Sequence, residues 1–435
     1  MHAARYRVAA GGAVRGEVTI PGDKSVSHRS LLLGGIATGT TEVEGFLESE
    51  DCLATLAAMR AMGVTVERPG PGRVRIDGVG LHGLQAPAGA LDMGNAGTAM
   101  RLSMGLLAGQ RFDSRLIGDA GLSRRPMERV AAPLRLMGAA IATSDGRPPV
   151  SIAAAAQLNG IEYDLGVPSA QVKSAILLAG LYASGTTTVI EHAVTRDHTE
   201  RMLRAFGATV RSEHGRVTVT GGERLRGASI RVPGDISSAT FFIVAATLAG
   251  EGAFLIRDVG LNPTRTGAID ILKLMGADIR ISNARTVGDE PIADLEVRAR
   301  ELNGIEVPRA LVPLAIDEFP VLFIAAAAAR GTTIVSGAEE LRVKERDRIA
   351  VMAAGLRTLG IDAEPRADGM RIVGGTLGSG HIDSHGDHRI AMAFAVAALR
   401  CRGPLEIRDV ANVATSFPGF APLARRAGIA IDELS

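Results

Sequence analysis

The stretch AAMRAMGVTVE, residues 57–67, contains the end of a helix, a glycine and the start of a strand. Alanine and methionine favour helix, whereas the valines and threonine after the glycine favour strand. Glycine readily takes the left-handed conformation that ends a helix, so each copy of this phrase predicts a helix stop. The phrase recurs as APLRLMGAAIA (132–142), RMLRAFGATVR (201–211), DILKLMGADIR (270–280), AGLRTLGIDAE (354–364) and PLARRAGIAID (422–432), with stops at Gly63, Gly138, Gly207, Gly276, Gly360 and Gly428.

A second block lies upstream of each copy and contains a polar turn, an apolar helix, another turn and a short strand. These helices are apolar on nearly every side, so we expect them to be buried on most sides. The copies lie about 70 to 85 residues apart, which is too long for a solenoid. The helices begin in DKSVSHRSLLL (23–33), NAGTAMRLSMG (95–105), SAQVKSAILLAG (169–180), DISSATFFIVAA (235–246), DEFPVLFIAAAA (317–328) and DHRIAMAFAVAAL (387–399).

Each copy therefore predicts an α/β unit of strand, helix, strand, helix and strand. Six such units in 435 residues indicate two lobes of three, because a single core stops growing at about 250 to 300 residues. The fourth unit begins near SIRVPGDISS (229–238). We expect a discontinuous first lobe of residues 1–20 and 236–435, a second lobe of residues 21–235, and an active-site cleft between them.

Composition excludes several classes of protein. The 48 Lys and Arg and 47 Asp and Glu side chains give a net charge of +1 without any run of like charge, so neither nucleic acid nor a membrane surface is indicated as a partner. Two isolated cysteines favour a reducing compartment over a disulfide framework. No secretion signal is visible, and the longest apolar runs fall short of the roughly 18 residues that a membrane span needs. We expect a soluble, cytoplasmic protein.

The residues that open the six apolar helices are all plausible N-caps. If each lobe has pseudo-threefold symmetry, three helix N-termini converge on one face, and their partial positive charges favour an anion there. Ordinary capping of buried helices is the alternative interpretation. The predicted caps are Asp23, Asn95, Ser169, Asp235, Asp317 and Asp387.

The segment GEVTIPGDKSVSHRS, residues 16–30, resembles a phosphate-binding P-loop but lacks the glycine directly before Lys24. With Asp23 as cap, Ser25 and Arg29 share one face of the helix, and Lys24 projects from its N-terminus. Cations are unfavourable at that position unless an anion is present. The pattern therefore predicts an anion site, and a solvated first turn is the alternative.

Other charged residues near turns or helix starts are candidates for binding and proton transfer. Asp317 precedes an almost wholly apolar helix, and cations that favour the ionised form flank Glu345. The three histidines of HIDSHGDH (381–388) have no evident fourth ligand, so no metal site is predicted, and the two cysteines are interpreted as small apolar thiols. The candidate arginines are Arg101, Arg125, Arg196, Arg348 and Arg389.

Five ordered phrases, PGDKSVSHRSLLL, GNAGTAMRL, PSAQVKSA, LRVKERDRI and GDHRIAMAF, together resemble the 5-enolpyruvylshikimate-3-phosphate (EPSP) synthase family across nearly the whole chain. The resemblance implies an α/β fold with two pseudo-threefold lobes of three βαβαββ units each. It also implies transfer of the enolpyruvyl group of phosphoenolpyruvate to the 5-hydroxyl of shikimate 3-phosphate, with release of phosphate and without a cofactor. The PSAQVKSA and TRDHTE phrases are similar to the second class of the family.

The resemblance also implies ligands, motif by motif. Asp317 would take the hydroxyl proton, while Glu345 and Lys24 would handle the proton at C3 of phosphoenolpyruvate. The implied ligands of shikimate 3-phosphate are Lys24, Ser25, Arg29, Ser169, Ala170, Gln171, Arg196, Asp317 and Lys344. Those of phosphoenolpyruvate are Lys24, Gly97, Arg125, Gln171, Arg348 and Arg389.

Some positions depart from many members of the family. Ala170 stands where many have a second serine, Glu340 replaces an asparagine, and Thr415 stands where many have a lysine that touches phosphoenolpyruvate. Glu340 and Thr415 are therefore not assigned as ligands. Gly97 is retained, and we expect glyphosate to compete with phosphoenolpyruvate.

Two alternatives remain at this point. A UDP-N-acetylglucosamine enolpyruvyl transferase would typically have a lysine-asparagine pair in place of Lys24-Ser25 and a cysteine near Arg125, which the loop GDAGLSRRPM (118–127) lacks. A non-catalytic sensor of a phosphorylated ligand could use the same scaffold, although Asp317 and Glu345 argue against it. We expect a monomer that binds small-molecule substrates and neither nucleic acid nor membrane.

Overall fold

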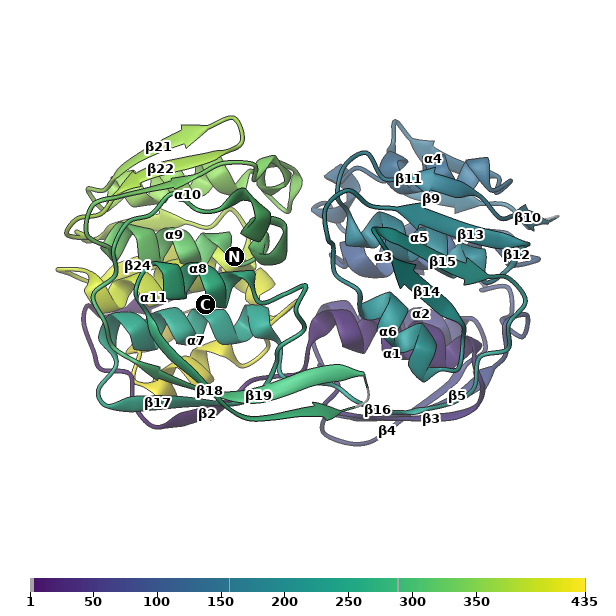
Figure 1. Cartoon of the computed structure of the whole chain (residues 1–435), viewed down its shortest axis with the longest axis horizontal. Coiled ribbons are helices and arrows are strands. Elements are labelled where there is room, and N and C mark those ends of the chain that lie inside the picture. The colour runs from purple at the N-terminus through teal and green to yellow at the C-terminus, as the bar shows by residue number, and fades with distance from the viewer. Residues whose placement is uncertain (1–3, 156, 288, 435) are drawn as a thin grey trace. The chain divides into compact units, whose positions relative to one another are not determined.

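The computed structural model describes residues 4–155, 157–287 and 289–434. The chain divides into two compact units, whose elements are labelled in Figure 1. Unit 1 comprises Met1–Pro21, Pro233–Thr286 and Pro291–Ser435, and unit 2 comprises Gly22–Val232 and Val287–Glu290. Each unit has its own hydrophobic core. Within the described ranges, no helix is long and apolar enough to cross a membrane.

The apolar helices form where the sequence predicts them. They are α1 (Lys24–Ile36), α3 (Gly97–Leu107), α5 (Ala170–Gly180), α7 (Ile236–Ala249), α9 (Phe319–Ala328) and α11 (His388–Ala397). In unit 1, α7, α9 and α11 pack against one another, and in unit 2, α3 packs against α1 and α5 (Figure 1). Nearly every residue of these helices is buried, as expected for helices without a polar face.

A second helix follows in every repeat and ends one or two residues before the predicted glycine. These helices are α2 (Glu50–Ala61), α4 (Glu128–Leu136), α6 (His198–Ala205), α8 (Gly267–Leu274), α10 (Arg348–Thr358) and α12 (Phe420–Ala427). All six predicted stop glycines have positive φ, between 82° and 104°. A side chain at such a position would be strained, so the recurrent glycine is a backbone requirement.

One strand order recurs around these helices. The strand after each apolar helix lies between a parallel neighbour and an antiparallel strand, which pairs in turn with the strand that follows the glycine stop. In unit 2 the strands are β16 (Ser229–Arg231), β3 (Thr38–Glu44), β5 (Arg73–Val79) and β4 (Thr65–Gly70); β6 (Leu91–Asp92), β7 (Ser114–Ile117), β9 (Arg147–Ile152) and β8 (Ile141–Ser144); β11 (Glu162–Asp164), β13 (Thr186–Ile190), β15 (Arg216–Thr220) and β14 (Val210–Glu213); and the small pair β10 (Leu158–Asn159) and β12 (Ala183–Ser184).

Unit 1 repeats the same order with one simplification. Its strands are β2 (Glu17–Thr19), β17 (Ala253–Gly260), β19 (Glu290–Arg298) and β18 (Asp278–Val287); β23 (Gly380–Asp383), β24 (Leu405–Arg408), β1 (Arg5–Val8) and β25 (Ile431–Leu434); and β20 (Thr332–Val335), β22 (Gly369–Val373) and β21 (Asp362–Arg366). In the three-stranded sheet a single bridge from Glu306 to Ile334 replaces the parallel strand. The predicted α/β fold of six repeated units is confirmed.

Four of the six predicted N-caps are confirmed, because the side chains of Asp23, Ser169, Asp235 and Asp387 accept hydrogen bonds from their own helices. The other two are wrong. Helix α3 has Ala96 at its N-cap, and the Asn95 amide instead donates to Asp119. Helix α9 has Glu318 at its N-cap, and the carboxylate of Asp317 pairs with cations from other segments.

The close approach of α3 and α5 generates a prediction about stability. A Cβ atom at Gly105 would lie 2.1 Å from the carbonyl oxygen of Ala175, so Gly105→Ala must push the two helices apart. We expect the substitution to cost about 1–3 kcal/mol of unfolding free energy. Thermal unfolding measures this effect, with Gly89→Ala as the control because that position has open space around it. Equal melting temperatures of the two variants would contradict the prediction.

Candidate active site

Lys24 is held at the start of α1 by an ion pair. Its Nζ donates to Oδ2 of Asp51 over 2.9 Å, and both side chains are largely buried. Asp51 lies in the first turn of α2, where a carboxylate is favourable. Sequence analysis missed this residue, because an acidic residue there is typical of any helix start.

Arg29 is buried and donates hydrogen bonds to three neutral oxygens. Its Nε donates to Thr199 over 2.7 Å, its Nη2 to Ser174 over 2.9 Å, and its Nη1 to the carbonyl oxygen of Ser25 over 3.0 Å. Burial lowers the pKa of Arg29 to about 10, while the Glu200 carboxylate acts in the opposite direction. Arg29 therefore stays charged at neutral pH.

Arg101 connects α3, α5 and the loop that carries Arg125. Its Nη1 donates to Oε1 of Gln171 over 2.5 Å, and its Nη2 donates to the carbonyl oxygen of Pro126 over 3.0 Å. The Gln171 amide donates in turn to the hydroxyl of Thr98 over 2.8 Å. These bonds fix the orientation of the predicted ligand Gln171.

Gly97 and Arg125 lie against one another. A Cβ atom at Gly97 would be 2.6 Å from Nη1 of Arg125 and 2.7 Å from its Cζ. The guanidinium group therefore occupies the space that any larger residue would fill. This contact explains why α3 begins with a glycine rather than with a better helix former.

The other candidates in unit 2 lie at the starts of α5 and α6. Ser169 caps α5, its Oγ accepting from the backbone N–H of Val172 over 3.4 Å, and Ala170 is the first residue of the helix. Arg196 is partly exposed and lies two residues before α6. The hydroxyl of Ser169 thus already has a structural role.

Unit 2 thereby gathers cations around the N-termini of three buried helices. Helix N-termini carry partial positive charge, and arginine binds phosphate or carboxylate through two donors. This arrangement can bind a multiply charged anion. The residues concerned are Lys24, Arg29, Arg101, Arg125 and Arg196.

Unit 1 instead pairs carboxylates with cations. Arg348 is buried and donates from Nε to Asp387 over 2.8 Å and from Nη2 to Glu345 over 2.6 Å, while its Nη1 lies 3.4 Å from Asp317. Burial acts to lower the pKa of Arg348, but these three carboxylates outweigh it and raise that pKa above its ordinary value. Sequence analysis recognised Asp387 only as a helix cap.

Asp317 lies at the centre of this cluster. Its Oδ1 is 3.3 Å from Nζ of Lys344, and its backbone oxygen accepts from Nη1 of Arg389 over 3.0 Å. Lys344 also lies 3.7 Å from Glu340. The Asp317 side chain keeps some exposure, and a carboxylate held in this way can accept a proton.

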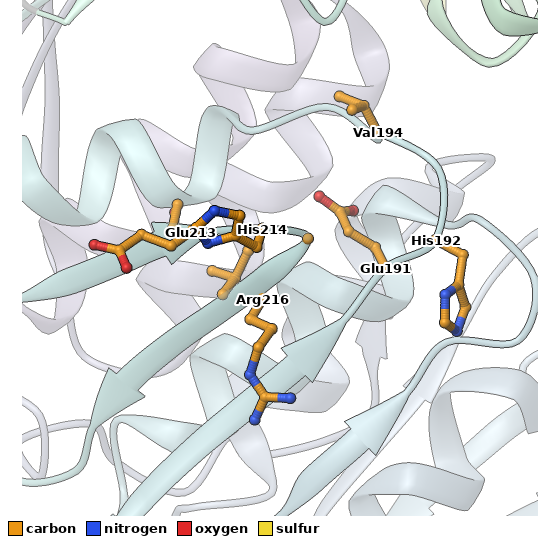
Figure 2. Close-up of a pocket in the computed structure, with 9 residues that line it drawn as sticks. Glu191, His192, Val194, Glu213, His214 and Arg216 are labelled. Carbon is orange, nitrogen blue, oxygen red and sulfur yellow. The ribbon is translucent and has the colours of Figure 1, made fainter.

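The remaining candidates for a functional site are a metal site, a reactive cysteine and a surface pocket, and none gains support within the described residues. No group of three or more His, Cys, Asp or Glu side chains there is arranged to hold a metal ion. Cys52 and Cys401 are buried, and burial raises the pKa of the Cys401 thiol to about 11. A pocket of about 530 Å³ lies beside β14 and β15 and contains none of the predicted ligands (Figure 2).

Comparison with known proteins agrees with these features. A family model for EPSP synthase (3-phosphoshikimate 1-carboxyvinyltransferase) matches residues 8–423. A 3-phosphoshikimate 1-carboxyvinyltransferase from Alkalilimnicola ehrlichii is 61% identical, over 98% of this chain and 96% of its own length. The solved EPSP synthase of Acinetobacter baumannii is 56% identical, with a TM-score of 0.89 over 99% of this chain and 100% of that chain.

A more distant structure shares the fold alone. The enolpyruvyl transferase of Streptomyces tendae is 18% identical, with a TM-score of 0.78 over 100% of this chain and 99% of that chain. The family assignment therefore depends on the full-length matches at high identity, which also fit the resemblance of the five sequence phrases. The chain belongs to the EPSP synthase (3-phosphoshikimate 1-carboxyvinyltransferase) family, whose members are enzymes of the shikimate pathway.

Proposed function

We propose that this chain transfers the enolpyruvyl group of phosphoenolpyruvate to the 5-hydroxyl of shikimate 3-phosphate and releases inorganic phosphate. The observation that carries the proposal is the carboxylate of Asp317, which does not cap α9 and instead lies within 3.4 Å of Lys344 and Arg348. A protein that only binds a phosphorylated ligand needs cations but has no use for such a base. We further propose a monomer in the cytoplasm with no nucleic acid or membrane partner.

The proposed ligands are those that the resemblance to the family implies. Cations at the N-termini of α1, α3 and α5 suit the phosphate and carboxylate groups of the two substrates. Shikimate 3-phosphate would contact Lys24, Ser25, Arg29, Ser169, Ala170, Gln171, Arg196, Asp317 and Lys344. Phosphoenolpyruvate would contact Lys24, Gly97, Arg125, Gln171, Arg348 and Arg389.

The proposed reaction is an addition followed by an elimination. The 5-hydroxyl oxygen attacks C2 of phosphoenolpyruvate as Asp317 takes the hydroxyl proton, and a proton is added at C3 to give a tetrahedral ketal. Loss of phosphate from C2 and of a proton from C3 then restores the double bond. Lys24 and Glu345 exchange the C3 proton, and the ion pairs to Asp51 and Arg348 orient these two groups.

A phosphate-release assay tests the function. We expect phosphate to appear only when phosphoenolpyruvate and shikimate 3-phosphate are both present, in a one-to-one ratio with the enolpyruvyl ether. UDP-N-acetylglucosamine is the control acceptor. Phosphate release from phosphoenolpyruvate with this acceptor, and not with shikimate 3-phosphate, would indicate the other enolpyruvyl transferase. Binding of shikimate 3-phosphate without phosphate release would instead favour a sensor.

Removal of Asp317 should affect turnover more than binding. We expect Asp317→Ala to lower kcat by about 10²- to 10⁴-fold, the usual contribution of a general base, with a smaller rise in the Kd for shikimate 3-phosphate. Steady-state kinetics and calorimetry measure the two quantities. Asp362→Ala is the control, since that exposed carboxylate pairs with Arg371 at the surface. Near-normal turnover of Asp317→Ala would remove its proposed role.

Gly97 should determine the fit of the enolpyruvyl donor. The methyl group of Gly97→Ala must displace the guanidinium of Arg125, so we expect the KM for phosphoenolpyruvate to rise about tenfold while the KM for shikimate 3-phosphate changes little. Glyphosate should compete with phosphoenolpyruvate in the unmodified protein and inhibit the variant less. The control is Gly89→Ala. Unmodified protein that resists millimolar glyphosate would contradict the competition.

A further inference from the structure

Lys173 is a fully buried cation inside α5 that the proposed reaction does not use. Its Nζ lies 2.6 Å from Oε1 of Glu200 and 3.1 Å from the carboxylate of Glu191, and it donates to the carbonyl oxygen of Thr195 over 3.5 Å. Burying an ammonium group costs several kcal/mol unless it is well paired. Three segments of unit 2 therefore meet at this one amine.

The first of these segments, residues 191–197, carries the predicted ligand Arg196. The hydroxyl of Thr195 donates to Oε2 of Glu191 over 2.7 Å within the segment, and Lys173 contacts both Glu191 and the carbonyl oxygen of Thr195. Figure 2 shows the Glu191 side chain below the chain that carries Val194. The backbone before Arg196 is thus fixed by two hydrogen bonds and an ion pair.

The other two segments, α5 and α6, hold Arg29. Ser174, next to Lys173, accepts from Nη2 of Arg29 over 2.9 Å and from the hydroxyl of Thr199 over 2.7 Å. Thr199, next to Glu200, accepts from Nε of Arg29 over 2.7 Å. The ion pair between Lys173 and Glu200 therefore lies directly beside the hydroxyl groups that orient Arg29.

We propose that Lys173 and Glu191 are positioning residues for the shikimate 3-phosphate site. They fix the segment of Arg196 to α5, whose start carries Ser169 and Gln171, so that these donors face one phosphorylated ligand together. This inference rests on the proposed function, because it needs Arg196 to be a substrate ligand. It also accounts for a fully buried lysine near the start of an apolar helix.

Two variants test the proposal without leaving a buried charge unpaired. Glu191→Gln keeps the pair between Lys173 and Glu200, and Thr195→Val removes only the hydroxyl that donates to Glu191. Lys173→Met is avoided because it would strand the buried Glu200 carboxylate. Glu213→Gln is the matched control, since Glu213, at the end of β14, lines the same surface pocket as Glu191 (Figure 2).

Calorimetry should show the Kd for shikimate 3-phosphate rising about tenfold in Glu191→Gln and about threefold in Thr195→Val, with no change in Glu213→Gln. At saturating substrate, kcat should stay within about twofold of the unmodified protein, because the chemistry lies elsewhere. A role in stability alone would lower the melting temperature or the active fraction without changing the Kd.

The outcomes separate this inference from the proposed function. Unchanged Kd values in both variants, or an equal rise in Glu213→Gln, would overturn the positioning role. If the unmodified protein itself fails to bind shikimate 3-phosphate, the proposed function fails and this inference fails with it. If the unmodified protein and Glu191→Gln both bind shikimate 3-phosphate tightly, the proposed function stands and only the positioning role is contradicted.

Discussion

The organisation of the molecule depends on burying six helices that are apolar on every face. Such a helix must be covered on all sides, and the repeated sheet and second helix of each unit provide that cover. A polar group along most of its length loses contact with water, so several of the proposed ligands lie at the helix starts. Lys24 and Gly97 are the first residues of α1 and α3, and Gln171 and Arg389 are the second residues of α5 and α11.

Two buried arginines of the candidate site, Arg348 and Arg29, differ in how their charge is balanced. Arg348 contacts the carboxylates of Asp387, Glu345 and Asp317, so its charge serves to hold acids in place. Arg29 donates to two hydroxyls and a carbonyl oxygen, and these uncharged acceptors do not neutralise it. A guanidinium with neutral partners retains its attraction for an anion. Arg29 is therefore suited to bind an anion, whereas Arg348 is suited to hold carboxylates in place.

Local sequence signals predict most of the fold and only part of the site. Each stop glycine could be predicted, because a positive φ after a helix is a local demand of the backbone. The side-chain partners of Asn95 and Asp317 could not be predicted locally. Asn95 donates to Asp119, and Asp317 pairs with cations that are distant in the sequence. The contact between Arg29 and Ser174 spans 145 positions, and no local pattern encodes it. Full-length family phrases supplied the ligand assignments that periodicity alone could not.

The interior of α5 shows why buried charge needs an explanation beyond stability. In unit 1, the buried helices α7 and α9 consist largely of apolar residues, including alanine, phenylalanine and isoleucine. Well-packed apolar side chains are often as stabilising as a buried ion pair, or more so. The ion pairs of Lys173 therefore add little that apolar packing could not supply. Apolar contacts are not directional, whereas hydrogen bonds and ion pairs are. The contacts of the Lys173 amine with two carboxylates and a carbonyl oxygen therefore fix the distance between α5 and the segment before Arg196.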